Sequence, residues 1–172
     1  MVHPNAYLIS KELALKIGGW DISLSPSPDE DAEYFARALI NASKIFFTNG
    51  FNYYRKVSDY DSLSKKRSLK HAIGAYKTTQ TKFDYIFKMQ KDEITKELYS
   101  NQLANLMYQY AAEYPIIDVM IRQELSSVGI TKLKLIEPSV FSFVANQFGF
   151  KLAMRLRSIK NLLSNKFMQA IS

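Results

Sequence analysis

Residues 25–40 read SPSPDEDAEYFARALI, and three consecutive acids, Asp29, Glu30 and Asp31, stand where this stretch turns helical. Ser and Pro mark a loop before them, and Asp29 suits the N-cap of a helix. Acids in a first helical turn interact favourably with the helix dipole, each by about 0.3–1 kcal/mol. Three adjacent acids also repel one another, which raises the pKa of at least one and suits a general base. The stretch predicts a helix start and leaves open whether the acids also belong to an active site.

The residues before this helix predict a strand and a short helix. Residues 5–9 (NAYLI) form an apolar run typical of a buried strand, and residues 11–17 (KELALKI) predict a helix. Ser10 suits the N-cap of that helix, and the Gly-Gly pair at 18–19 ends it.

Residues 44–48 (KIFFT) and 51–57 (FNYYRKV) predict a β-hairpin. They flank an Asn-Gly pair, which is a strong signal for a two-residue turn. Side chains alternate along a strand, so Tyr53 and Arg55 share one face of the second strand and Tyr54 lies on the other. The front of the chain is therefore expected to be mixed α/β.

From Ser64 onward the chain reads as helix. Over residues 64–91, apolar side chains recur at steps of three and four. The cations of this segment are expected mostly on its other faces: Lys65, Lys66, Arg67, Lys70, Lys77, Lys82 and Lys88. Further helices are expected at 93–113, 115–128, 139–147 and 149–165, with Pro115 in a first turn and Gly129 as a C-cap. The predicted fold class is α+β and mostly helical, with one domain at 1–61 and a helical region at 62–172.

Charge is distributed unevenly along the chain. Residues 1–61 hold six Lys or Arg and eight Asp or Glu, whereas residues 62–172 hold seventeen and eight. The two regions carry net charges of −2 and +9, which add to the +7 of the chain. A basic region attracts polyanions such as anionic lipid, nucleotide phosphates or nucleic acid. Because no recognised nucleic-acid motif is present and acids are interspersed, nucleic acid is the least favoured of these partners.

The composition excludes several kinds of site. The chain has no cysteine, which removes disulfides, thiolate nucleophiles and cysteine metal sites. No apolar run approaches the ~18 residues needed to span a bilayer. The first ten residues lack the pattern of a signal peptide. We therefore expect a cytoplasmic protein, with peripheral membrane contact as the alternative.

Two Asp-x-Asp triplets occur, at residues 29–31 and 59–61. Paired carboxylates can hold a divalent ion that bridges a diphosphate. A metal-binding pair usually ends an apolar strand, whereas the first triplet opens a helix and the second lies in a polar loop. We therefore assign no metal ligand in this chain.

The last predicted helix is amphipathic and basic. One stripe of it is apolar and its cations lie elsewhere: Leu152, Leu156, Ile159 and Leu163 against Lys151, Arg155 and Lys160. Such a helix either packs against neighbouring helices, which we favour, or lies on an anionic membrane. A non-catalytic helical module that docks on a partner chain or an anionic membrane is therefore an alternative function.

Five short motifs follow one another at suitable spacing within residues 3–64. They are a Gly-Gly-aromatic-Asp turn, an acidic pair opening a helix, an aromatic-x-Arg on that helix, a Tyr-Tyr-Arg strand end and a Ser-Leu-Ser segment, at 18–21, 30–31, 35–37, 53–55 and 62–64. In this order they resemble the C-terminal half of the catalytic domain of family-2 glycosyltransferases. The helices beyond resemble the variable appendage that such bacterial enzymes often carry.

The resemblance implies a GT-A fold and inverting transfer of a sugar from a nucleotide-sugar donor to an acceptor hydroxyl, as in glycan biosynthesis. In that scheme Asp31 is the general base that deprotonates the acceptor, and Glu30 supports it. The residues expected to bind substrate are Trp20, Arg37, Tyr54 and Arg55, with Arg55 approaching the diphosphate.

Members of that family also carry a nucleotide-binding half and a metal-binding Asp-x-Asp before this region, and neither is recognised in this sequence. We therefore expect the complete enzyme to use Mg²⁺ or Mn²⁺, with none held by this chain alone. We also expect either a truncated or split enzyme, whose donor side a partner chain supplies, or a chain that has lost activity; in both cases the chain alone is expected to be inactive.

Overall fold

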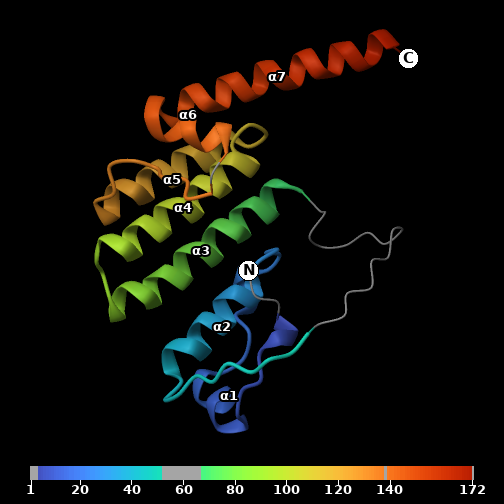
Figure 1. The fold of residues 1–172 in the computed structure, drawn as a ribbon. Coiled ribbons are helices and arrows are strands. Elements are labelled where there is room, and N and C mark those ends of the chain that lie inside the picture. Colours follow the sequence, from blue (N-terminus) through green and yellow to red (C-terminus); the bar gives the residue numbers. More distant parts are fainter. Residues whose placement is uncertain (1–3, 52–66, 138, 172) are drawn as a thin grey trace. The chain divides into compact units, whose positions relative to one another are not determined.

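The computed structural model describes residues 4–51, 67–137 and 139–171, with the helical backbone alone from 161 to 171. Every regular element in these residues is helical, and the fold is mostly helical as predicted (Figure 1). The elements are η1 (Pro4–Ala6), α1 (Lys11–Ile17), η2 (Ile22–Leu24), α2 (Glu30–Asn41), α3 (Leu69–Met89), α4 (Glu93–Tyr110), α5 (Pro115–Val128), α6 (Val140–Phe148) and α7 (Phe150–Ile171). None of the helices described is long and apolar enough to cross a membrane.

The chain forms two compact units, Met1–Lys91 and Asp92–Ser172. The domain boundary predicted at residue 61 lies outside the described residues and stays a prediction.

The predicted strands are wrong where the structure describes them. Residues 5–9 hold the end of the η1 turn and then irregular chain, and residues 44–48 form no regular element. The second hairpin strand, at 51–57, lies almost wholly outside the described residues. A strand needs a neighbour that takes up its backbone N–H and C=O groups, and none of the described segments supplies one. The composition of these runs favours a strand, but no strand forms in the part of them that the structure describes.

Local signals set the ends of α1 and the start of α2. Ser10 Oγ accepts a hydrogen bond from the Leu13 backbone N at 3.1 Å, which caps α1 as predicted. Gly18 ends α1 with a φ of 77°, a conformation that costs glycine little. Asp29 occupies the N-cap position of α2 as predicted, although its side chain caps no backbone N–H there.

In the first unit α2 packs against both α1 and α3. Gly74 of α3 lets the loop before α2 approach closely, since a Cβ at that position would lie 2.2 Å from the Pro26 carbonyl oxygen. Beside this contact the Thr78 hydroxyl donates to Ser27 Oγ at 2.9 Å, and both residues are fully buried. These contacts hold residues 24–27, which lead into α2, against α3.

In the second unit α4 packs against α5, and α6 packs against α7. Pro115 begins α5 and Gly129 ends it with a φ of 75°, both as predicted. The helices predicted at 139–147 and 149–165 are confirmed as α6 and α7, with α7 continuing to Ile171. Most of the deeply buried apolar side chains of this unit come from α4 and α5: Tyr99, Leu103, Ala104, Met107, Ile117 and Ile121.

Candidate functional site

The acids at the head of α2 have different partners. Asp29 Oδ2 lies 3.6 Å from Nζ of Lys82 on α3. Burial is the largest cause that raises the pKa of Asp29, and repulsion by Asp31 adds to it, while the charge of Lys82 opposes both. The pKa of Lys82 is lowered, again chiefly by burial. The first acid of the cluster is therefore held in a largely buried ion pair.

Lys82 is the partner that sequence reasoning missed. It was expected on an outer face of its helix, and this is wrong, because Lys82 is only 8% exposed. The available signal was its spacing, since Lys82 falls three and four residues after the buried Thr79 and Thr78. A cation in phase with the buried side of a helix indicates a buried acid opposite it.

Glu30 reaches back to the loop before α2. Its Oε2 accepts a long hydrogen bond from the Ser27 backbone N at 3.4 Å. Ser27 Oγ in turn accepts from the Asp29 backbone N at 3.2 Å. Glu30 therefore contributes to the turn that presents the next residue, Asp31.

Asp31 is half-buried. Its Oδ1 accepts from the Ala32 backbone N at 3.0 Å. Among the described residues, no side chain forms an ion pair or hydrogen bond with it. The charge of Asp31 acts to raise the pKa of Lys82, although the two side chains form no ion pair. Asp31 can therefore accept a proton or a hydrogen bond from a bound molecule.

Arg37 holds the loop after α1 against α2 through hydrogen bonds. Its Nε donates to Glu33 Oε1 at 2.5 Å and its NH2 to Glu33 Oε2 at 3.1 Å. The same guanidinium donates to two backbone carbonyls, those of Ile17 and, at 2.9 Å, Gly19. Glu33 is only 1% exposed, so this pair is buried at its acidic end. The spacing of four residues on one helix favours the pair of Arg37 with Glu33, whereas the two carbonyl contacts come from a segment about twenty residues earlier.

The loop that Arg37 holds carries Trp20 and places it against α2. The Trp20 ring stacks on Tyr34, with centroids 4.5 Å apart and planes 16° apart. Phe35 meets the edge of this pair at 6.3 Å from the Trp20 ring. Trp20 remains 49% exposed. Because Tyr34 follows Asp31 by three residues on one helix, the two lie on neighbouring positions of the same face. The structure thus stacks the predicted Trp20 on the helix that carries Asp31, about one turn further along it.

Tyr54 and Arg55 lie outside the described residues, as do Asp59 and Asp61 of the second Asp-x-Asp triplet. Their predicted roles remain untested. In the part of the chain that the structure describes, no three His, Asp or Glu side chains gather closely enough to hold a metal ion.

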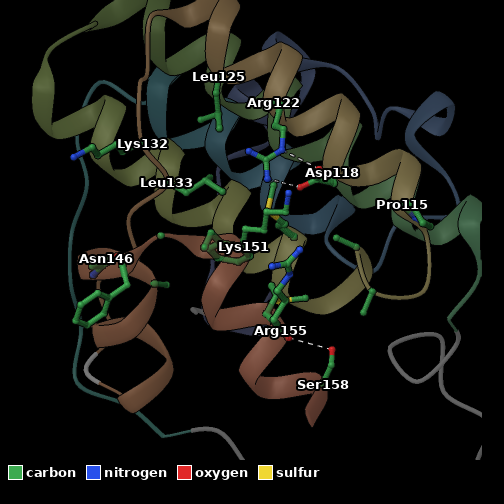
Figure 2. Close-up of a pocket in the computed structure, with 18 of the residues that line it drawn as sticks. Pro115, Asp118, Arg122, Leu125, Lys132, Leu133, Asn146, Lys151, Arg155 and Ser158 are labelled. Carbon is green, nitrogen blue, oxygen red and sulfur yellow. Dashed lines mark hydrogen bonds and ion pairs between the residues drawn. The ribbon is translucent and has the colours of Figure 1, made fainter. Parts of the chain in front are cut away.

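The second unit has an open groove with a volume of about 1240 Å³. Its lining is largely apolar and includes Met107, Leu125 and Phe150. Charged side chains from three segments also line it, as Figure 2 shows: Asp118, Arg122, Lys132, Lys151 and Arg155. Arg122 Nε binds Asp118 Oδ2 at 2.8 Å, which leaves three cations in excess. The groove therefore suits an anionic group beside an apolar one.

A scan against protein-family models matches none, and searches of curated proteins and of solved structures return no match.

Proposed function

We propose that this chain forms the acceptor and catalytic-base side of an inverting glycosyltransferase similar to family 2. The sequence support is the ordered set of five motifs described above. The structural observation that favours it most is at the head of α2, where Asp31 has no side-chain partner among the described residues and Trp20 and Tyr34 stack one turn away.

In the proposed reaction Asp31 takes the proton of the acceptor hydroxyl as that oxygen attacks the anomeric carbon of the donor sugar. The anomeric bond to the leaving nucleotide phosphate then breaks with inversion. The half-exposed Trp20, which stacks on Tyr34, offers an aromatic surface that suits the apolar face of a sugar ring. Glu30 stabilises the turn before Asp31, and in this scheme it helps to position Asp31 without contacting the substrate.

Arg37 fits a positioning role better than direct substrate binding. Its guanidinium has five N–H donors, and four hydrogen bonds go to Glu33, Ile17 and Gly19. These bonds hold the loop that carries Trp20. Tyr54 and Arg55 keep their proposed contacts with the substrate and the diphosphate.

A partner chain is proposed to supply the nucleotide-binding side and the Mg²⁺ or Mn²⁺ site. Residues 43–51 are all exposed and irregular, although this segment is rich in large apolar side chains. Phe46, Phe47 and Phe51 are 81%, 96% and 82% exposed, and Ile45 is 52% exposed. A contiguous exposed apolar segment marks an interaction site. Extended chain of this composition can join a sheet edge of another protein.

The first test is calorimetric titration with uridine diphosphate and Mn²⁺. We would titrate the chain alone and then together with the protein encoded next to it. Binding only in the presence of that protein supports a split enzyme, and Phe46→Ser with Phe47→Ser should then abolish the association. Binding by the chain alone would place the donor site within this chain. No binding in either case would count against the glycosyltransferase proposal.

The second test concerns Asp31 itself. In the reconstituted enzyme, Asp31→Asn should abolish sugar transfer while donor binding stays close to wild type. Glu12→Gln is the matched control, since Glu12 is an exposed acid in the first turn of α1. Full transfer by Asp31→Asn would remove Asp31 from the role of base.

A further inference from the structure

The C-terminal part of the chain carries charge of one sign. Residues 138–172 include five Lys or Arg and neither Asp nor Glu. Helices α6 and α7 take up most of this segment, and they lie together at one side of their unit (Figure 1). Cations in such a segment find no acid on their own helices.

One face of α7 packs onto the rest of the second unit. Phe150 and Ala153 are buried on this inner face. Arg157 fixes it further, because its guanidinium lies 3.6 Å from the centroid of the Tyr108 ring and donates to the Tyr108 carbonyl. The orientation of α7 about its axis is therefore set by packing within the unit.

An apolar stripe of α7 lies away from this inner face, and its last residue, Ile159, also lines the groove of the unit. Leu152, Leu156 and Ile159 are 42%, 49% and 53% exposed. At about 100° per residue, these three side chains fall within about 60° of one another and about 120° from the inner face. Packing within the unit, which was the favoured expectation for this stripe, leaves these three side chains about half in solvent.

Cations border the stripe on both sides. The same helical spacing puts Lys151 and Arg155 along one edge and Lys160 along the other. All three are exposed, and the structure gives none of them an ion pair with a carboxylate of the described residues. Lys151 and Arg155 also line the groove, together with Lys132 (Figure 2). The stripe thus has exposed cations along both of its edges.

Helix α6 adds further exposed apolar side chains to this part of the molecule. Val140, Phe143 and Phe148 are 83%, 62% and 66% exposed. Large apolar side chains of this number on two adjoining helices exceed the scattered exposure that is normal for a protein surface.

We propose that the outer face of α7, with α6 beside it, docks in the plane of an anionic phospholipid bilayer. Leu152, Leu156 and Ile159 would enter the boundary between headgroups and acyl chains, and the flanking cations would meet the lipid phosphates. An apolar stripe edged by Lys and Arg is the arrangement of interfacial helices. A nucleic acid would satisfy the cations but would leave the stripe in water. The proposal depends only on residues of the second unit and is independent of any role of Asp31.

The test is sedimentation of the full chain with phosphatidylcholine vesicles, prepared with and without phosphatidylglycerol. Binding is expected only to the anionic vesicles, and added salt should weaken it. The triple variant Lys151→Glu, Arg155→Glu, Lys160→Glu should bind at least about 100-fold more weakly, because each lost cation removes roughly a fivefold factor and the new carboxylates add repulsion. The triple variant Leu152→Ser, Leu156→Ser, Ile159→Ser keeps the charge and should lose about tenfold or more.

Matched controls separate a specific face from general basicity. Lys11, Lys70 and Lys77 are exposed, form no ion pair within the described residues and lie in the first unit. Their replacement by Glu makes the same charge change and should leave most of the binding. Equal loss in both charge variants would overturn the proposal, as would unchanged binding of the serine variant. Tighter binding to duplex DNA than to vesicles, lost in the same glutamate variant, would also overturn it. Circular dichroism of each variant checks that the helices remain.

Discussion

Lys82 Nζ of α3 lies 3.6 Å from Asp29 Oδ2 at the head of α2, and both side chains are largely removed from water. Burial favours the neutral form of each group, so it raises the pKa of Asp29 and lowers the pKa of Lys82. The attraction between them opposes these shifts without cancelling them. The pair therefore links two helices of the first unit while it carries a cost of desolvation.

Replacing only Lys82 should destabilise the first unit. Lys82→Met leaves Asp29 without its cation, and we expect a loss of about 2 kcal/mol in the free energy of unfolding. Asp29→Asn combined with Lys82→Met removes both charges and should recover most of that loss. Urea denaturation measures all three proteins. Lys77→Met is the control, because Lys77 is exposed on the same helix. Equal losses in the single and double variants would show that the two charges do not act together.

The raised pKa of Asp29 predicts a dependence of stability on pH. The folded chain holds the proton of Asp29 more tightly than the unfolded chain does. The contribution of this carboxyl is therefore fully present below its ordinary pKa and is lost as the pH rises through its folded pKa. We expect wild type to lose stability relative to Asp29→Asn between acid and neutral conditions, as measured by urea denaturation across that range. A difference that is flat with pH, or of opposite slope, would contradict the assignment.

Arg37 should be far more important to stability than a surface arginine in the same sequence arrangement. Arg37→Gln leaves the buried Glu33 carboxylate without its cation, and the carbonyls of Ile17 and Gly19 lose their donor. We expect a loss of about 3 kcal/mol in the free energy of unfolding. Trp20 is the single tryptophan of the chain, so a shift of its fluorescence to longer wavelength would report the released loop directly.

Arg122→Gln is the matched control for Arg37→Gln. Arg122 also pairs with an acid four residues before it, Asp118, but the side chains of that pair are 54% and 37% exposed. Exposed pairs contribute about 0–1 kcal/mol, so this variant should stay close to wild type. Similar losses for the two arginines, with unchanged Trp20 emission, would contradict the role given to Arg37.

The sequence predicted those features that depend on local chemistry. The helix ends at Ser10, Pro115 and Gly129 each depend on one residue. Ser10 accepts a hydrogen bond from a backbone N–H, Pro115 occupies the first turn of α5, and Gly129 adopts a positive φ. The strands at 5–9 and 44–48 were wrong because β structure depends on a neighbour, and none of the described segments is that neighbour.

The candidate site shows the same division between local and distant causes. The helix start at Asp29 and the pairing of Glu33 with Arg37 follow from local spacing. The burial of Lys82 and the carbonyl contacts of Arg37 depend on segments distant in sequence. Only tertiary packing brings those segments together, and contacts between distant segments cannot be read from local patterns in a single sequence.

Gly74 provides a prediction in which two physical effects have opposite signs. In a helix interior, Gly→Ala normally stabilises by about 0.5–1 kcal/mol because alanine loses less backbone entropy. At Gly74 the new Cβ would lie 2.2 Å from the Pro26 carbonyl oxygen and 3.0 Å from that of Leu24. Backbone atoms cannot move aside cheaply, so we expect Gly74→Ala to destabilise by about 1–3 kcal/mol. Thermal denaturation of this variant should show a lower midpoint, with Gly50→Ala, whose Cβ meets nothing within 4 Å, as the control. A midpoint above that of wild type would mean that α3 does not approach residues 24–26 as closely as the structure places it.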